Sequence, residues 1–396
     1  MSLYAQHGYG KSNKIDRGIQ GRHLAGVILS PKDERPDKMG EYINYLQTNY
    51  PSIDILFDPQ FYVTTVIPAN EGNLIRYDYY ESSLTRRNFV APSDLARYVE
   101  RTIDYQMGLN LTNIVSPSIL LDNFNDPWSQ IALSLAHESQ AYHSRFNNGS
   151  SLLISLCFSE MALRNSDALN EFLDMISLLD VHGFYIIIKR DNNNGSPQIE
   201  PIILQNLMYL SYVLSYINQY TVVLGYTDFV GVPLYATGIS AISCGWYNGL
   251  REFSLSRFQP STGGRRPRAR YSSQQLLNSI LIIPELDTIN RLGMINSVLS
   301  NTNYDGVIRP NPANTVWPLD LSCLHHWQIL NRIISGIDNM ASVSEKLDYV
   351  VGLIDQADIT YSTFVNANII FDNKSNREHL RQWRIGIDGF RNQLGV

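Results

Sequence analysis

Short apolar runs alternate with helix-like stretches through roughly the first two thirds of the chain. The runs are continuous rather than alternating in hydrophobicity, and each ends in a polar or charged residue. Continuous apolar runs are typical of parallel strands that are buried on both faces, and the helical stretch after each run supplies the crossover. The pattern predicts seven strands, at residues 24–29, 53–57, 114–121, 152–158, 183–189, 221–224 and 239–243.

The position of an eighth strand is ambiguous, because residues 252–255 and residues 269–271 are both short candidates. Helices are expected between the strands, at residues 37–50, from 126 onward, 165–179 and 200–217. Asp and Asn side chains at these starts suit helix caps, and Pro suits the first helical turn. From residue 272 onward the chain reads as helices, most clearly at 344–356 and 375–394.

Seven or eight strand–helix units of this size favour an α/β fold with a closed, TIM-like (β/α)8 barrel over an open doubly wound sheet. No glycine-rich dinucleotide fingerprint follows the first predicted strand. The predicted organisation is a polar N-terminal arm (1–22), a barrel (23–271) and a helical C-terminal extension (272–396). A long insertion (61–109) follows the second predicted strand, and its aromatic residues favour an ordered lid or a contact surface.

Composition narrows the class of protein. Of the 396 residues, 44% are hydrophobic and 17% are charged, which is typical of a globular protein. The net charge of -6 argues against a general nucleic-acid binder but leaves room for a local basic patch. Cys157, Cys244 and Cys323 are too few for a disulfide framework. The chain shows neither a secretory signal nor an apolar run of membrane-spanning length, so we expect a soluble, cytoplasmic protein.

In a barrel, the residues that follow the strands meet at one mouth, where ligands bind. We expect the catalytic groups among these to be Asp58, Asp122, Glu160 and Arg190. Crowded carboxylates raise one another's pKa and can divide acid and base roles. Substrate contacts are expected from Lys189, Tyr226, Asp228 and Trp246. The alternative is structural, since strand-end acids often cap the next helix or pair with nearby cations.

Residues 249–271 are rich in arginine, with glycine and proline between the arginines. Arginine forks match phosphate oxygens, and barrels commonly bind phosphate near their last two strands. The segment therefore predicts a clamp on a phosphorylated ligand or a nucleic-acid backbone, unless its arginines are solvated or pair with acids elsewhere. Its expected binding residues are Arg251, Arg265, Arg266, Arg268 and Arg270.

Motifs for other chemistries are weak or absent. Neither the adjacent pair His325 and His326 nor the pair His137 and His143 has a spacing that favours a shared ion, so no metal and no cofactor is expected. Nucleophile elbows, phosphate-binding Walker loops and zincin motifs are not found. The insertion tyrosines, Tyr62, Tyr77, Tyr79 and Tyr80, are candidates for stacking on a base or a sugar.

A barrel with aspartates at strand ends and a basic loop on its late units resembles the tRNA-guanine transglycosylases and related DNA-modifying barrels. In that family one aspartate attacks the sugar carbon and another accepts a proton from the base. The resemblance implies that Asp58 and Asp122 are the counterparts of these two residues. The chain departs from the family in lacking its zinc-binding cysteine cluster and its glycine-rich base-binding stretch.

Three functions follow from these patterns. The first is a barrel enzyme that acts on a phosphate-bearing nucleotide or nucleic acid by transglycosylase or other glycosidic-bond chemistry. The second is a glycoside-type hydrolase that uses two carboxylates, with the insertion aromatics as a sugar platform. The third is a catalytically inactive barrel, which would bind a protein partner through the insertion (61–109) or the C-terminal helices.

Overall fold

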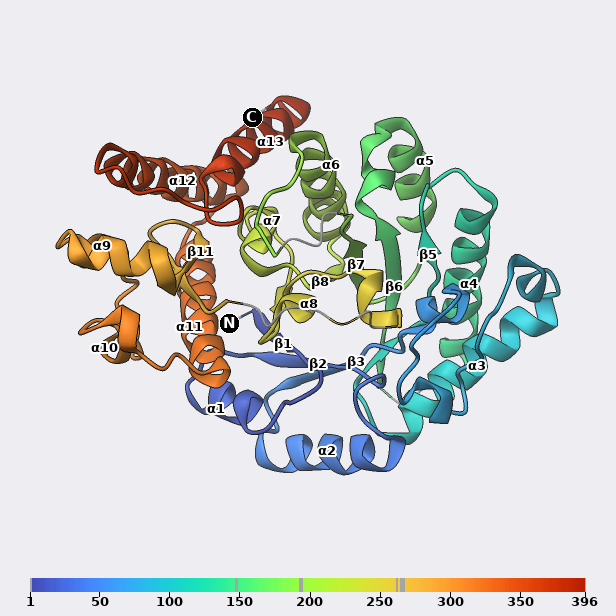
Figure 1. The fold of residues 1–396 in the computed structure, drawn as a ribbon. Coiled ribbons are helices and arrows are strands. Elements are labelled where there is room, and N and C mark those ends of the chain that lie inside the picture. Colours follow the sequence, from blue (N-terminus) through green and yellow to red (C-terminus); the bar gives the residue numbers. More distant parts are fainter. Residues whose placement is uncertain (1, 147–148, 192–194, 261–262, 264–267, 396) are drawn as a thin grey trace.

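The chain forms a ring of parallel strands surrounded by helices, with the last helices gathered on one side (Figure 1). This computed structural model describes residues 2–146, 149–191, 195–260, 263 and 268–395. The ladder of paired strands runs β3-β2-β1-β9-β8-β7-β6-β4, and β3 and β4 contact each other across the remaining seam. The predicted TIM-like (β/α)8 barrel is therefore confirmed.

The strands are short and almost completely buried, as expected for a parallel sheet covered on both faces. The eight strands of the ring are β1 (Leu3–Gln6), β2 (Gly26–Leu29), β3 (Asp54–Phe57), β4 (Asn113–Val115), β6 (Ser151–Ser159), β7 (Gly183–Lys189), β8 (Thr221–Gly225) and β9 (Ala241–Cys244). A two-residue strand, β5 (Leu120–Leu121), also pairs with β6, and β10 (Arg270–Ser273) forms an antiparallel hairpin with β11 (Asn278–Leu281).

Helices follow the strands around the ring. Their bounds are α1 (Lys14–Gln20), α2 (Pro36–Asn49), α3 (Pro92–Gly108), α4 (Pro127–His143), α5 (Ser166–Ile176), α6 (Pro201–Tyr212), α7 (Gly231–Tyr235), α8 (Asn248–Arg251), α9 (Asp287–Arg291), α10 (Asp305–Ile308), α11 (Leu319–Asp338), α12 (Val343–Asn366) and α13 (Glu378–Leu394). Local sequence sets several starts: Asp126 caps α4, Asn165 caps α5, and proline opens α2, α3, α4 and α6.

The first strand of the barrel was missed in the sequence. Residues 3–6, assigned above to a polar N-terminal arm, form β1 between β2 and β9. The segment has only four residues and ends in Gln6, so it shows no apolar run. Gln6 is nevertheless buried and accepts a hydrogen bond from Ser243 Oγ at 2.9 Å. Each predicted strand is therefore one number later in the order of the barrel than the sequence suggested. The insertion follows the third strand rather than the second.

Both candidates for the eighth strand are wrong. Residues 252–255 run into a short 3₁₀ turn (Leu255–Phe258), and residues 269–271 lead into the β10–β11 hairpin. The eighth strand of the ring is β9. Helix α11, which lies within the predicted C-terminal extension, packs on β1 between α1 and α7. It occupies the place of the eighth helix of the barrel, so the extension supplies part of the outer ring.

The insertion contributes little regular structure before α3, which is the helix that follows β3 around the ring. Residues 61–91 hold three 3₁₀ turns, Phe61–Thr65, Leu74–Arg76 and Arg86–Phe89. Within the described ranges, no helix combines the length and the apolar character that a bilayer crossing requires.

Gly183 tests how tightly the wall of the barrel is packed. A Cβ atom at this position would lie 1.9 Å from the carbonyl oxygen of Thr221 on the neighbouring strand β8. We expect Gly183→Ala to lower the free energy of unfolding by about 2 kcal/mol or more, measured by urea denaturation. The matched control is Gly352→Ala in α12, where a Cβ would meet open space and alanine favours the helix. Equal stability of the two variants would contradict this packing.

Candidate active site at the mouth of the barrel

Asp58 lies inside the ring at the carboxyl end of β3, and its side chain is fully buried. Its Oδ2 accepts hydrogen bonds from the hydroxyls of Tyr62 at 2.9 Å and Tyr185 at 3.4 Å. Its Oδ1 accepts the backbone N–H of Gln60 at 3.0 Å. Since Tyr185 comes from β7, across the ring, the geometry places the Asp58 carboxyl in the interior of the barrel mouth.

The surroundings of Asp58 favour its protonated form. Burial raises the pKa of this carboxyl from 3.8 to about 6, although the Gln60 N–H, the Tyr62 hydroxyl and the positive charge of Arg257 act in the opposite direction. Removing an ionised carboxylate from water disfavours its charge more than these neighbours compensate. A carboxyl that titrates near neutral pH is suited to accept or donate a proton at working pH.

An arginine network joins Asp58 to the neighbouring strand ends. Arg257, which is buried, pairs with Asp33 and donates to Tyr226 Oη at 2.8 Å and Ser30 Oγ at 2.9 Å. Ser30 Oγ also accepts from the side-chain amide of Gln60, the residue whose backbone N–H contacts Asp58. The ends of β2, β3 and β8 are therefore tied together by one buried guanidinium.

The segment 252–258, which we call the mouth cover, closes this end of the barrel. It follows α8 and crosses the centre of the ring (Figure 1). The rings of Phe253 and Phe258 pack edge-on against Tyr62, with centroid distances of 5.2 and 6.0 Å. Both phenylalanines are 0% exposed, so Asp58 has no contact with solvent in this structure.

A second acidic cluster lies beside the mouth cover. Glu160, at the end of β6, pairs with Arg190 at 2.5 Å and accepts the backbone N–H of Asp191 at 2.8 Å. The backbone N–H of Arg190 donates to the carbonyl oxygen of Phe253 at 2.9 Å, which joins this cluster to the cover. A cavity of about 90 Å³ adjoins the ion pair and is also lined by Ser196.

Glu252 is the most perturbed acid of the second cluster. Its Oε2 accepts the backbone N–H of Gly195 at 2.9 Å, whereas its buried Oε1 has no hydrogen-bond partner among the described residues. Burial raises the pKa of Glu252 to about 7, despite the opposing charge of Arg190. A half-satisfied buried carboxyl is costly for stability, which points to a role other than holding the fold.

Two of the predicted residues lie at the rim rather than in the interior. Asp122 is 68% exposed and pairs with Lys189 at 3.2 Å, and Lys189 also lies 3.6 Å from Asp191. Asp122 follows the two-residue strand β5 rather than β4, which turns it outward. The structure therefore brings Asp58 and Tyr226 together, and Glu160 and Arg190 together, but leaves Asp122 outside both clusters.

Trp246 is a packing residue at the end of β9. It is 1% exposed, and its indole N–H donates to the carbonyl oxygen of Tyr9 at 2.9 Å. Asp228 lies apart from Asp58, where it faces His326 at 2.9 Å and Arg251 at 3.9 Å.

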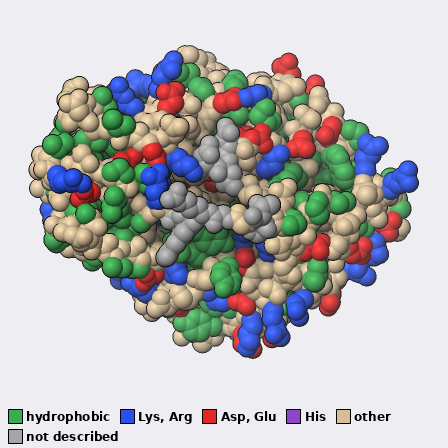
Figure 2. Space-filling view, viewed as in Figure 1, with side chains coloured by type: hydrophobic (Ala, Val, Ile, Leu, Met, Phe, Trp, Pro, Cys, Tyr) green, Lys and Arg blue, Asp and Glu red, His purple; other side chains and the backbone are tan. Residues whose placement is uncertain are grey.

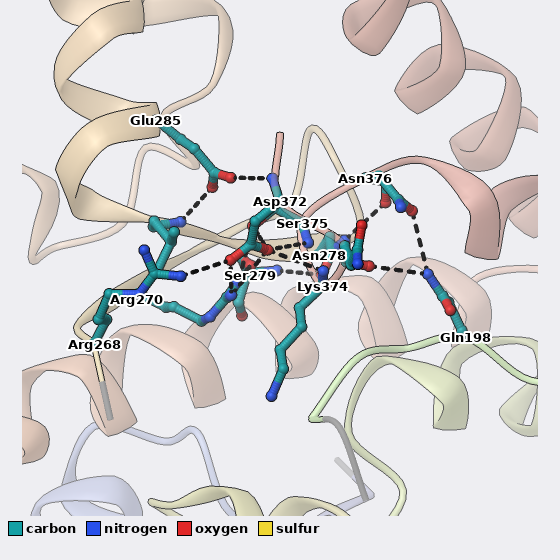
Figure 3. A network of polar contacts seen from close by, with 12 residues as sticks. Gln198, Arg268, Arg270, Asn278, Ser279, Glu285, Asp372, Lys374, Ser375 and Asn376 are labelled. Carbon is teal, nitrogen blue, oxygen red and sulfur yellow. Dashed lines mark hydrogen bonds and ion pairs between the residues drawn. The ribbon is translucent and has the colours of Figure 1, made fainter. Parts of the chain in front are cut away.

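The predicted arginine clamp does not form as one site among the described residues. Arg268 and Arg270 pair with Asp372 at 3.2 and 2.8 Å, and so tie the β10–β11 hairpin to the loop before α13 (Figure 3). Arg251 pairs with Asp228, and Arg265 and Arg266 lie outside the described residues. Basic and acidic side chains are interspersed over this face, without a large area of one sign (Figure 2).

The insertion does not present its tyrosines for stacking. Tyr77, Tyr79 and Tyr80 are buried, and their hydroxyls donate to Glu34, Pro59 and Glu71. These contacts fold the insertion onto the rim of the barrel, so the tyrosines serve as core and the predicted sugar platform is wrong.

The exposed feature of the insertion is a different one. Arg86 and Arg87 are exposed on a 3₁₀ turn and line an open cavity of about 410 Å³ with Thr85 and Trp128. Phe89, on the same turn, packs edge-on against Trp128 at 6.1 Å.

Sequence reasoning missed several central residues. Tyr62, Tyr185 and Arg257 contact Asp58 or its network. The sequence patterns did not predict Tyr185 or Arg257 as site residues, and they predicted Tyr62 only as a stacking residue. Tyr185 lies within an apolar strand. A single polar side chain in such a strand can indicate a position that faces a site inside the barrel. Glu252 could have been identified in a similar way, because it is the one acidic residue in the arginine-rich segment 249–271.

Comparisons with known proteins add little beyond the fold. No family model and no curated protein matches the sequence. Among solved structures, the chain is similar to 3-hexulose-6-phosphate synthase, with 10% identity, 62% of this chain and 90% of that chain covered, and a TM-score of 0.33. This match is too distant to carry an argument about function. The comparisons show no link to the tRNA-guanine transglycosylases.

The raised pKa of Asp58 predicts a pH-dependent stability. Between pH 3.8 and about 6 the folded chain holds a proton on Asp58 that the unfolded chain has released. Stability of the wild type is therefore lost as the pH rises through this window, by about 3 kcal/mol, relative to Asp58→Asn. Urea unfolding of both proteins at a series of pH values measures the difference. The exposed control, Asp174→Asn on α5, should follow the wild type, and a pH-independent difference for Asp58→Asn would refute the prediction.

Proposed function

We propose that this protein is a barrel enzyme that breaks or exchanges a glycosidic bond in a phosphate-bearing nucleotide or nucleic acid. The observation that carries the proposal is the Asp58 carboxyl, which is buried at the barrel mouth between two tyrosine hydroxyls with a pKa raised to about 6. Burial of such a group weakens the fold, and this cost is explained if the carboxyl reacts.

The roles follow from position and charge. Asp58 either attacks the sugar carbon as the nucleophile or acts as the proton acceptor that activates the attacking group. Glu252, whose pKa is raised to about 7, is the acid that protonates the departing nucleobase. The positive charge of Arg257 acts on Asp58 and that of Arg190 acts on Glu252, and Glu160 positions Arg190. The rings of Tyr62 and Tyr226, which Phe253 covers in this structure, would provide flat walls for a planar nucleobase once the cover is displaced.

The phosphate would be held by the insertion rather than by the arginine-rich segment. Among the described residues, neither Arg86 nor Arg87 has an acidic partner, and both share a cavity with the Trp128 indole. Arginine binds phosphate oxygens through its fork, and an indole can stack on a base. Phe89, on the same turn as these arginines, packs against Phe61. Phe61 directly precedes Tyr62, whose hydroxyl donates to Asp58, so the cavity lies at the same end of the barrel as Asp58.

Access requires the mouth cover to move. Substrate reaches Asp58 only if Phe253 and Phe258 leave the centre of the ring, because both are fully buried against Tyr62. Substrate-induced movement of such segments is common in barrel enzymes and excludes water during the reaction. Arg257 is the natural anchor of the closed state through its pair with Asp33.

The same cover supports a second candidate function. A barrel whose mouth is filled by its own aromatic side chains is also what a catalytically inactive interaction subunit would show. In that case Asp58 and Arg257 hold the cover in place and have no substrate. The glycoside-hydrolase alternative loses its sugar platform, since Tyr77 and Tyr79 pack against Phe57 and Tyr105 and Tyr80 is also buried.

Asp58→Asn separates the two functions. Wild-type protein is incubated with nucleoside monophosphates and with single-stranded DNA and RNA oligonucleotides, and base release or exchange of labelled base is measured by chromatography. The enzyme proposal expects turnover that falls by about 100-fold or more in Asp58→Asn. Asp174→Asn, a surface carboxyl on α5, should retain wild-type activity. Turnover unaffected by Asp58→Asn, or no turnover with any of these substrates, counts against the proposal.

The phosphate site has its own test. We expect the double variant Arg86→Ala and Arg87→Ala to bind single-stranded oligonucleotides more weakly and to reduce the salt slope of log K by about 1.4, which corresponds to two lost phosphate contacts. Fluorescence anisotropy at several salt concentrations measures this slope. Arg381→Ala, an exposed arginine on α13, is the matched control. An unchanged slope in the double variant would place the phosphate elsewhere.

A further inference from the structure

Three potential metal ligands meet where α11 packs against the barrel. Asp228 follows β8, Cys244 is the last residue of β9, and His326 lies on α11. Their ligand atoms all lie within 4.8 Å of one another. These three residues are far apart in the sequence, so no spacing motif predicted that they would meet. The adjacent strands β8 and β9 and the eighth-helix position of α11 bring them together.

The Nε2 edge of the His326 imidazole faces this cluster. The side chain is 0% exposed, and its Nε2 lies 2.9 Å from Oδ1 of Asp228. Apart from this close carboxylate, no hydrogen-bond partner satisfies Nε2 among the residues that the structure describes. A buried ring nitrogen beside a carboxylate and a thiol, with no bond of its own, suits a metal ion.

The groups around the cluster match those that orient metal ligands. The other ring nitrogen of His326, Nδ1, lies 2.9 Å from Ser272 Oγ on β10, which can fix the ring with Nε2 free to bind. The second oxygen of Asp228 faces Arg251 at 3.9 Å. Partners of this kind on the far side of a histidine and a carboxylate are typical of metal sites. Asp228 also adopts a positive φ of 46°, a strained conformation that non-glycine residues adopt rarely.

We propose that Asp228, Cys244 and His326 bind one Zn²⁺ ion. Oxygen, thiolate and imidazole ligands suit zinc, and three protein ligands leave a fourth position for water. Tetrahedral zinc ligands lie about 3.3–3.8 Å apart, so a movement of about 1 Å brings the three atoms to bonding geometry. The ion would fasten α11 to the carboxyl ends of β8 and β9, and the proposal is independent of the chemistry assigned to Asp58.

Metal content of the full chain tests the proposal first. Protein purified from zinc-supplemented cells and then desalted should contain about one zinc per chain by mass spectrometry. Cys244→Ser and His326→Gln should weaken zinc binding by at least about 10-fold to 100-fold in competition with a chromophoric chelator. Cys157→Ser removes a different buried free thiol and should leave zinc binding unchanged.

Cobalt substitution decides the case if a variant fails to fold. Wild-type protein loaded with Co²⁺ should show a thiolate-to-cobalt charge-transfer band in the near ultraviolet, and Cys157→Ser should keep this band. Cys244→Ser should lose it. Wild-type protein that takes up no zinc and gives no cobalt band would overturn the proposal, as would a Cys244→Ser variant that binds both metals as tightly as the wild type.

Discussion

The closed ring of parallel strands imposes the constraint on which the rest of the structure depends. Parallel strands all end at the same side, so a closed ring delivers the residues after every strand to one mouth. The residues so delivered include Asp58 and Glu160, and both are buried. Each buried charge must therefore find a partner or change its protonation.

The clusters at the mouth resolve this constraint in different ways. Asp33 and Glu160 are matched by Arg257 and Arg190, whose side chains are only 8% and 10% exposed. Within the part of the chain that the structure describes, no cation is bonded to Asp58 or Glu252, and burial raises the pKa of each carboxyl. This contrast separates groups that hold the mouth together from groups that are free to exchange a proton, and it is the basis on which Asp58 and Glu252 are assigned to chemistry.

The sequence predicted the elements with strong local patterns. Strand β7 was predicted with its observed bounds because five consecutive residues, 184–188, form an apolar run between Gly183 and Lys189, whereas β1 was missed because its four residues include Gln6. Helix α11 was expected outside the barrel because nothing local records which strands a helix packs against. Asp58 could be identified as a strand-end acid, but its partners Tyr62, Tyr185 and Arg257 depend on ring closure, which brings together segments far apart in the chain. Arg268 and Arg270 were misjudged for the same reason, since Asp372 lies about a hundred residues away.

Titration of the Asp58 carboxyl by NMR tests the central claim most directly. Aspartate labelled with ¹³C at the carboxyl carbon gives a resonance that Asp58→Asn assigns by its disappearance. If the carboxyl is enclosed at the barrel mouth as described, its chemical shift should titrate with a midpoint near pH 6. A midpoint close to the value of 3.8 for an exposed aspartate would contradict the burial of Asp58 and the catalytic role built on it.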